Sequence, residues 1–322
     1  MLFKASLSMQ ASSAKRQKVN EGLGSSRDDY EFELIFDQAN TFRNLIDITG
    51  NVLKDIQFSI VVNDDFRGIT VRNMDATKSC IVLARVACEV DVRNESTDAM
   101  FCIRTQTLLT CLKAIPSNYV MSMIQYKDSP DIHIKASSSD NGEMDEVSFR
   151  VNTMVCTEPC KEIRNLNYDF NVNMELNTLR TVIKLCKELG AETVLFEVSE
   201  ASRNTDEGDG GQVETALFVT IEAQGTDVAI RRKFISMDVM ESKDGQASVV
   251  KETCNDKKEC DFANSVKKCS ESFSTEYLNM CLRSMEKNVL NIRLSTDKPL
   301  VVNYPLDMDG SLVCLVIAAK VA

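Results

Sequence analysis

Apolar and polar residues alternate along much of the chain from Tyr30 onward, as they do in strands that bury one face. In the first half this pattern predicts strands at 32–36, 56–62, 68–74, 80–86, 99–103 and 147–154, with two more within 119–136. Two other segments carry apolar residues at helical spacing, which predicts helices at 37–54 and 104–114.

The same order of elements returns in the second half. Strands are predicted at 170–174, 192–198, 216–223 and 227–235, with two more within 289–304. Helices are predicted at 177–189, where Gly190 is a typical stop signal, and at 274–287. Each half contains a helix, a set of strands, a second helix and a hairpin with a proline in its turn. This repetition predicts an α+β protein built by internal duplication of one unit.

Three polar segments lack this periodicity. Residues 199–214 and 241–270 are rich in turn-forming and charged residues, so we expect surface loops inserted there. Residues 1–29 are expected to form a flexible N-terminal tail. The basic run from Lys15 to Lys18 is either a nuclear import signal or part of a solvated tail, and the residues favour neither.

Composition argues against a membrane protein, a disulfide framework and a metal site. No stretch reaches about 18 consecutive apolar residues, so no membrane association is expected. The 12 cysteines are scattered, several at apolar-periodic positions, which favours reduced core residues. Neither the pair Cys156 and Cys160 nor the group 254, 260 and 269 has the paired spacing of a zinc site, and His133 is the only histidine. We therefore expect no metal and no cofactor.

Catalytic motifs are also missing. The sequence has no P-loop, no G-x-G-x-x-G after a strand and no G-x-S-x-G. His133 lies in a predicted strand between Ile132 and Ile134, where exposure on a strand face is more typical than catalysis. The adjacent Asp64 and Asp65 are typical turn residues. We expect no enzyme activity and no catalytic residue.

Charge is distributed unevenly between the predicted helices and the rest of the chain. The net charge of −11 argues on average against nucleic-acid binding. The four predicted helices, however, carry nine basic and five acidic residues, a net of +4, whereas the remaining chain carries 28 basic and 43 acidic, a net of −15. In a single helix, such an excess of basic residues would be explained by an ordinary solvent-exposed face. The same bias in four helices favours an anionic partner that is bound without sequence preference.

Several segments, in this order and spacing, carry a family resemblance. They are GITVRNMD at 68–75, the helix end LCKELG before a valine-rich strand, and EYLNMCLRSM followed by STDKPLVVNY. Together they resemble the DNA sliding clamps of the proliferating cell nuclear antigen family over about residues 30–322, more weakly through 199–270. The resemblance implies a DNA-clamp fold of two similar domains, each with two helices packed on antiparallel sheets. Domain boundaries would be 30–152 and 169–322, with a connecting linker at 153–168.

The resemblance also implies a function. Clamps of this family are non-catalytic homotrimeric rings that encircle double-stranded DNA, with helices lining the hole and sheets outside. They tether DNA polymerase and other replication and repair proteins, and a clamp loader places them on DNA. By position, the pore residues would be Arg43, Arg104, Lys113, Arg180, Lys184, Lys187 and Arg283. Gly50, Thr110 and Glu276 depart from the family, which has basic residues there.

Partners of the family dock a short peptide beneath the linker between the domains. The implied pocket residues here are Met74, Ile163, Pro299 and Val316, although plain core packing would explain the same apolar residues. Ile163 is the only match in a stretch that reads Leu-Gly-Ile-Pro in the family.

Two relatives of the same fold are alternatives to a homotrimeric clamp. One is a checkpoint-type subunit of a heterotrimeric ring, and the other is a monomeric viral processivity factor. The expected location is the nucleus, or a viral replication site if the protein is encoded by a virus.

Overall fold

The computed structural model describes residues 30–93, 99–127, 129–138, 145–155, 167–204, 213–237, 249–250, 265–286, 289–306 and 310–320. The expected tail at 1–29, most of the linker including Ile163, and most of 241–270 lie outside these residues.

The described residues of the first half form nine strands and two helices. They are β1 (Tyr30–Phe36), α2 (Ala39–Thr49), β2 (Asp55–Val62), β3 (Arg67–Met74), β4 (Cys80–Ala87), β5 (Glu89–Val92), β6 (Met100–Arg104), α3 (Thr105–Lys113), β7 (Val120–Tyr126), β8 (Ile132–Ser138) and β9 (Asp145–Val151).

The second half repeats this order element for element. Its elements are β10 (Phe170–Glu175), α4 (Leu176–Glu188), β11 (Thr193–Asn204), β12 (Val213–Gln224), β13 (Ala229–Met237), β14 (Val249–Val250), β15 (Ser265–Ser274), α5 (Thr275–Leu282), β16 (Val289–Leu294), β17 (Leu300–Pro305) and β18 (Leu312–Ile317). The strand pairing repeats as well. Strand β1 lies between β5 and β7 as β10 lies between β14 and β16, although β5 is antiparallel to β1 and β14 is parallel to β10. Strand β2 lies between β3 and β6 as β11 lies between β12 and β15. The predicted α+β duplication is confirmed.

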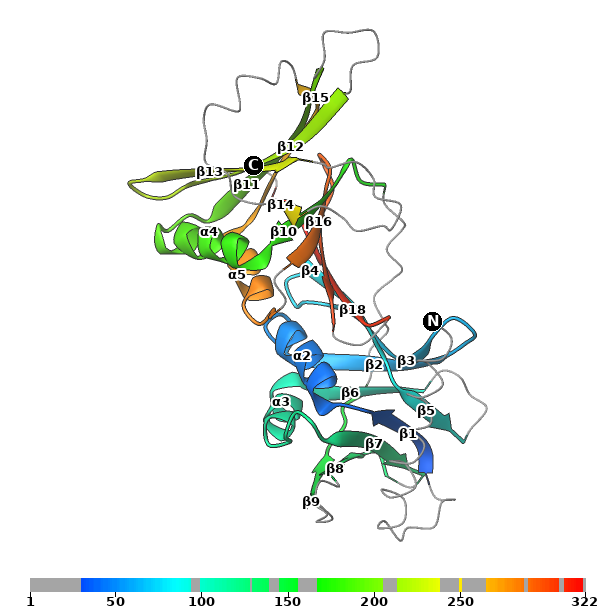
Figure 1. Cartoon of the computed structure of the whole chain (residues 1–322). Coiled ribbons are helices and arrows are strands. Elements are labelled where there is room, and N and C mark those ends of the chain that lie inside the picture. The colour runs from blue at the N-terminus through cyan, green and yellow to red at the C-terminus, as the bar shows by residue number, and fades with distance from the viewer. Residues whose placement is uncertain are drawn as a thin grey trace.

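The two halves share one sheet. Strand β18, the last of the second half, pairs antiparallel with β4 of the first half, giving a nine-stranded sheet in the order β14-β10-β16-β17-β18-β4-β3-β2-β6. Strands β9 and β13 are edge strands of the remaining five-stranded and four-stranded sheets. They lie at opposite ends of the molecule, β9 at the bottom and β13 at the top of Figure 1.

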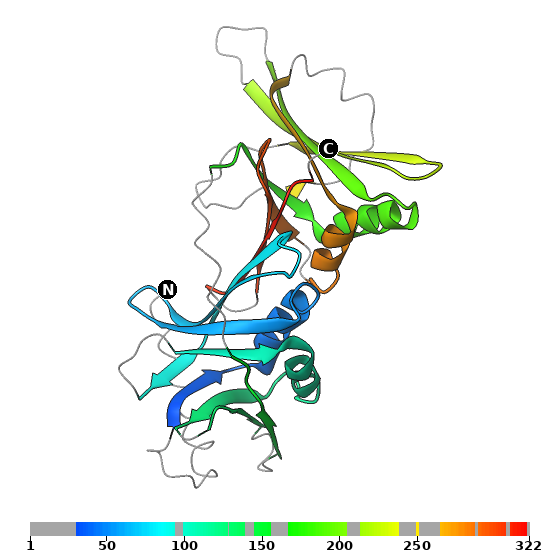
Figure 2. The same ribbon diagram turned by 180° about the vertical axis from the view of Figure 1, so that it is seen from behind.

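All four helices lie on one side of the sheets, as the two opposite views in Figures 1 and 2 show. They form a row, because α2 packs against both α3 and α5, and α5 packs against α4. Each helix buries an apolar stripe, which in α4 comprises Leu176, Leu179, Val182, Ile183 and Cys186. The alternate residues of β4 that face the helices, including Cys80, Val82 and Val86, are fully buried. The nine-stranded sheet therefore has one face covered by helices and one outer face.

Two helices are shorter than the apolar pattern predicts. Helix α2 ends at Thr49 rather than near residue 54, and the chain turns at Gly50, where a Cβ would approach the carbonyl oxygen of Ile46 to 2.7 Å. Helix α5 ends at Leu282, not Lys287, and Arg283 is its C-cap residue. Buried apolar residues beyond each end, Leu53 and Met285, lengthen the amphipathic pattern without belonging to the helix.

The inserted segments also differ from expectation. Strand β11 continues to Asn204 and β12 begins at Val213, and they pair residue by residue, so the described residues 199–204 and 213–214 of the expected loop are strand. Within 241–270, β14 and the start of β15 are strand. The pattern missed β5, β14, β15 and β18.

Polar contacts also cross between the halves. The carboxylate of Asp75, after β3, accepts hydrogen bonds from the Tyr277 hydroxyl of α5 at 2.7 Å and from the Cys80 backbone N–H at 2.6 Å. Asn51, just after α2, donates through Nδ2 to Oγ of Ser284 at 2.8 Å. Burial acts to raise the pKa of Asp75. The hydrogen bonds from Thr77, Tyr277 and the backbone outweigh it and hold that pKa below its ordinary value.

Candidate nucleic-acid interface

The helix row presents one polar surface away from the sheets, and most of the predicted pore residues belong to it. Arg104 is the N-cap of α3 and Lys113 is its last residue, and both are exposed. Lys184 and Lys187 are exposed on α4, and Arg283 is exposed directly after α5.

The remaining two pore residues, Arg43 and Arg180, are half-buried. Arg43 lies on α2 directly after the buried Phe42. The structure thus brings the exposed basic residues of α3, α4 and α5 to the side of the molecule that the helices occupy (Figure 2).

Arg180 has a structural role that the sequence did not reveal. From α4, its Nε and Nη2 donate to the carbonyl oxygen of Leu282 at 3.1 and 3.0 Å, and Nη2 also donates to the carbonyl oxygen of Met285. The last carbonyls of a helix have no partner within the helix, and a cation there is favoured by the helix dipole. Arg180 therefore caps α5 and joins it to α4.

The observed helices alone are less positive than the predicted helix limits suggested. They contain five basic and three acidic residues, a net of +2, because Arg104 and Arg283 lie just outside their ends, whereas Asp37, Lys54, Glu286 and Lys287, also outside, cancel one another. Arg104 and Arg283, which flank α3 and α5, add two positive charges to the same row. Lys184 also approaches Glu188 at 3.8 Å in an exposed pair, which holds its side chain only weakly.

Neutral hydroxyl groups, which charge counting overlooked, complete the surface. Thr110 and Thr181 are exposed on α3 and α4, and each donates to the backbone carbonyl four residues earlier, at 2.8 Å. Glu276, exposed at the start of α5, is the acidic exception that the sequence indicated. The arrangement provides a few mobile positive charges among neutral groups. Such a surface suits phosphate contacts and lacks a means of base readout.

A second candidate site lies on the outer face of the nine-stranded sheet. Met74 of β3 is 39% exposed and pairs with Ile81 of β4, which pairs with Val316 of β18. Val316 in turn pairs with Val301 of β17, two residues after Pro299. The structure thus gathers three of the four predicted pocket residues on one face. Val316 is itself buried, and Ile81 and Val301 are members that the sequence missed, because only the strand register reveals them.

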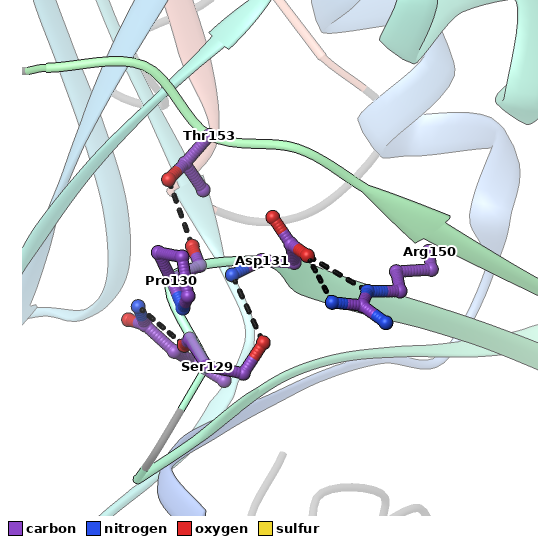
Figure 3. Close-up of polar contacts among 6 residues, drawn as sticks. Ser129, Pro130, Asp131, Arg150 and Thr153 are labelled. Atoms are coloured by element: carbon purple, nitrogen blue, oxygen red, sulfur yellow. Dashed lines mark hydrogen bonds and ion pairs between the residues drawn. The ribbon is translucent and has the colours of Figure 1, made fainter.

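The described residues at the two ends of the linker are anchored by hydrogen bonds. At its start, Thr153 Oγ1 donates to the carbonyl oxygen of Pro130 at 2.8 Å, beside the Arg150–Asp131 ion pair at 2.7 Å (Figure 3). At its end, the Tyr168 hydroxyl donates to the carbonyl oxygen of Pro299 at 3.0 Å.

Other candidate chemistry is sparse in the described part of the chain. Those residues include no cluster of three or more potential metal ligands, and none of their helices is long and apolar enough to cross a membrane. His133 is half-buried rather than exposed, with its ring edge-on to Tyr126 at 4.9 Å. Burial, with the positive charges of Arg150 and Lys135, lowers the pKa of His133 and keeps it neutral near pH 7.

Solved structures with the same fold cover nearly the whole chain. PCNA from Thermococcus kodakaraensis has a TM-score of 0.66 at 18% sequence identity, and the match covers 90% of this chain and 100% of that one. Proliferating cellular nuclear antigen from Entamoeba histolytica has a TM-score of 0.66 at 14% identity, covering 91% and 100%. The fold is that of a PCNA clamp. The PCNA2–PCNA3 complex of Sulfolobus tokodaii also matches, with a TM-score of 0.62 at 13% identity over 89% of this chain and 99% of that one. The sequence matches no protein-family model, and no curated protein sequence matches it.

Within this clamp fold, the helix row and the apolar strip lie on opposite faces of the sheets. The predicted fold class is therefore confirmed. The two sets of predicted site residues remain predictions, now with defined positions.

Proposed function

We propose that this protein is a DNA sliding clamp that encircles duplex DNA without sequence preference and holds DNA polymerase and other replication or repair proteins on it. The observation that carries the proposal is the row of four helices on one side of a PCNA-type fold, with exposed Lys113, Lys184, Lys187 and Arg283 on it. The rest of the chain is strongly acidic, which disfavours DNA binding to any other face.

The contacts would be weak and mobile. Each exposed lysine or arginine neutralises a phosphate without fixing a register, and each would contribute about 1 kcal/mol or less. This suits a ring that slides. It also means that the protein stays on DNA because a closed ring surrounds the duplex, and not because it binds the duplex tightly.

Partner proteins would dock on the outer strip of Met74, Ile81, Val316 and Val301, beneath the linker. Within this strip Met74 is 39% exposed and Ile81 is partly exposed, whereas Val301 and Val316 are buried, so Met74 and Ile81 offer the accessible apolar surface for a short peptide. Ile163 stays a predicted contributor from the linker itself. By resemblance to the family, we also propose that a clamp loader places the protein on DNA and that it acts in the nucleus or at a viral replication site.

Two alternatives keep the fold but change the assembly, namely a subunit of a heterotrimeric ring and a monomeric processivity factor. Edge strands β9 and β13 at opposite ends of the molecule favour a ring, because uncovered edges invite pairing with another chain. Mass in solution separates the homotrimer from both alternatives, and a monomer that forms trimers only with other chains would indicate the heterotrimeric ring. A species of three subunits supports the homotrimer, and a monomer at micromolar concentration contradicts it.

The DNA-facing surface is tested by charge reversal with a matched control. Lys184→Glu combined with Arg283→Glu changes a trimeric ring by twelve charge units on the helix side. Arg85→Glu combined with Arg293→Glu makes the same change on the outer sheet face, where both arginines are exposed. We expect the first variant alone to bind duplex DNA more weakly in a direct binding assay at low salt, a readout that needs no docked partner and so does not depend on Arg293 lying opposite Val301 of the strip. Equal losses in both variants would show that net charge, not the helix surface, governs DNA contact.

A further inference from the structure

The middle of the nine-stranded sheet differs in charge from the rest of the chain. Strands β16, β17, β18, β4 and β3 are neighbours in that order, and none of them contains an aspartate, a glutamate or a lysine. Their charged residues are all arginines, namely Arg67, Arg72, Arg85 and Arg293. The whole chain, in contrast, carries 48 acidic and 37 basic residues. A positively charged region thus lies within an acidic protein.

Arg85 and Arg293 flank the strip on the outer face of the sheet. Arg85 is four residues after Ile81 on β4, so strand alternation places both on one face, and Arg293 of β16 lies opposite Val301. Both arginines are exposed, and neither forms an ion pair with another described residue. Arg85 lies over the ring of Phe66, 5.8 Å from its centroid. Both charges are therefore accessible to a partner.

The surface between these two arginines is apolar. Leu83, two residues before Arg85, lies opposite Cys314 of β18, and Leu312 of β18 lies opposite Arg85 itself. Leu83, Cys314 and Leu312 are all half-buried, so they extend the accessible apolar surface of the strip. A third exposed arginine, Arg72 of β3, lies opposite Leu83. Apolar contact and positive charge are thus adjacent on one face.

The charge of Arg293 acts on the strip itself. Burial raises the pKa of the Cys314 thiol to about 11, and the positive charge of Arg293 opposes this rise. Burial and the nearby Cys314 also raise the pKa of Tyr168, and Arg293 again opposes the rise. An anionic group bound over these side chains would therefore be attracted by Arg293.

The chain's own acidic residues do not balance this charge. Asp55, exposed on the neighbouring strand β2, lies opposite Arg104 of β6. The linker sequence at 156–166 has no net charge, because its two acidic residues are offset by two basic ones, Glu158 and Glu162 against Lys161 and Arg164. The strip therefore suits a partner that brings negative charge.

We propose that the strip binds an extended peptide whose apolar residues are flanked by aspartate or glutamate, with the acidic side chains paired to Arg85 and Arg293. This proposal rests on the docking strip of the proposed function and specifies the peptide that docks there. Arginine suits the role because its planar guanidinium donates two parallel hydrogen bonds to a carboxylate. A nucleic-acid backbone would leave the apolar residues between the arginines uncovered, which favours a peptide.

The positions of the two arginines set the spacing of the acidic residues. Three steps between neighbouring strands, of about 4.8 Å each, separate β4 from β16, which gives about 14 Å. Ile81 lies in one row with Val316, Val301 and Arg293. Arg85 is four residues further along β4, or about 13 Å. The two arginine Cα atoms are therefore about 19 Å apart, the length of about six extended residues.

Selection from a random peptide library tests the proposal without a known partner. A phage-displayed library of dodecapeptides is selected on the full-length parent protein. We expect enrichment of aspartate and glutamate about six positions apart, with apolar residues between them. Selected peptides whose flanks are basic or uncharged would overturn the proposal, as would a selection that yields no binder.

Charge exchange then tests the two arginines in a direct binding assay with a selected, fluorescently labelled peptide. Arg85→Glu with Arg293→Glu should weaken binding at low salt by about tenfold or more, because two attractions become repulsions. Arg85→Gln with Arg293→Gln should weaken it less. A peptide with lysine in place of both acidic residues should bind the glutamate variant more tightly than it binds the parent, a gain that misfolding cannot produce.

The matched control is Lys184→Glu with Arg283→Glu, which makes the same change of net charge on the helix row. It should leave the affinity for the selected peptide unchanged, and equal losses in both charge variants would overturn the proposal. Weaker duplex DNA binding by the Arg85 and Arg293 variant would also overturn it, because these arginines would then contact phosphate.

Met74→Glu separates failure of this proposal from failure of the docking strip. If it abolishes binding of the selected peptides while charge reversal at Arg85 and Arg293 leaves their affinity unchanged, the strip is the docking site and the acidic specificity is wrong. If neither change weakens binding, the peptides dock elsewhere, and both the strip and the proposal are wrong.

Discussion

Replacing Arg180 by methionine separates a structural arginine from a DNA-binding one. Methionine keeps the aliphatic stem but removes the guanidinium hydrogen bonds to the carbonyl oxygens of Leu282 and Met285. Hydrogen bonds from a charged donor contribute about 1.5–3 kcal/mol, and the site is half-buried, so we expect a loss of about 2 kcal/mol in the free energy of unfolding. Lys184→Met on the same helix removes only an exposed pair with Glu188 at 3.8 Å and should cost less than about 0.5 kcal/mol.

The assay is urea denaturation of both variants and the parent at one protein concentration, because assembly makes apparent stability concentration-dependent. Amide hydrogen exchange should locate the effect, with faster exchange in α5 of the Arg180 variant only. If the two variants are equally stable, the capping role is wrong. Arg180 would then return to the candidate DNA contacts.

Three further results are expected. Asp75→Asn should lower stability at pH 7 but flatten its acid dependence. Because the folded pKa of Asp75 is lowered, the stability that its carboxylate contributes is present above the unfolded pKa of about 3.9 and is lost as pH falls through the folded pKa. Denaturation of the variant and the parent at pH 7 and pH 3 checks this, and an unchanged acid dependence would contradict it. Burial raises the pKa of Cys88 to about 12 and that of Cys314 to about 11. A thiolate-directed reagent should therefore leave both thiols unmodified at pH 8 until the protein unfolds. Detection of either labelled cysteine by mass spectrometry of the native protein would refute this. Met74→Glu, like Ile163→Glu, should abolish binding of a polymerase-derived peptide without changing the mass of the oligomer, and unchanged peptide affinity would exclude the strip as the docking site.

The order of most elements could be predicted because each predicted segment shows either the two-residue alternation of a strand or the apolar spacing of a helix. Strand alternation and helical spacing are local properties, and both halves repeat them. Helix ends were less predictable, since Leu53 and Met285 extend the apolar pattern past the last helical residue. Strands were predicted at 192–198 and 216–223, but their extension to Asn204 and from Val213 was missed because these residues are mostly polar, and pairing between the two strands decides their structure.

The candidate sites were predictable in residue type but not in role. Arg180 has the same helical spacing as Lys184 and Lys187, and only the nearby end of α5 makes it a cap. Val316 was expected in a pocket, yet β18 had not been predicted, so its burial in the middle of a shared sheet could not be foreseen. Such properties depend on contacts between residues more than 100 positions apart, which periodicity does not encode.

Encirclement of DNA is tested most directly by trapping the protein between two blocked ends. Purified protein is threaded onto a duplex that is attached to a bead at one end, and the free end is then closed with biotin and streptavidin. We expect a fraction of the protein to survive washing at 1 M salt, where the Debye length is about 3 Å and simple phosphate contacts are lost. Cutting the duplex with a restriction enzyme should then release that fraction. If salt removes the protein equally from open and closed duplexes, or if cutting releases none of it, the protein does not encircle DNA.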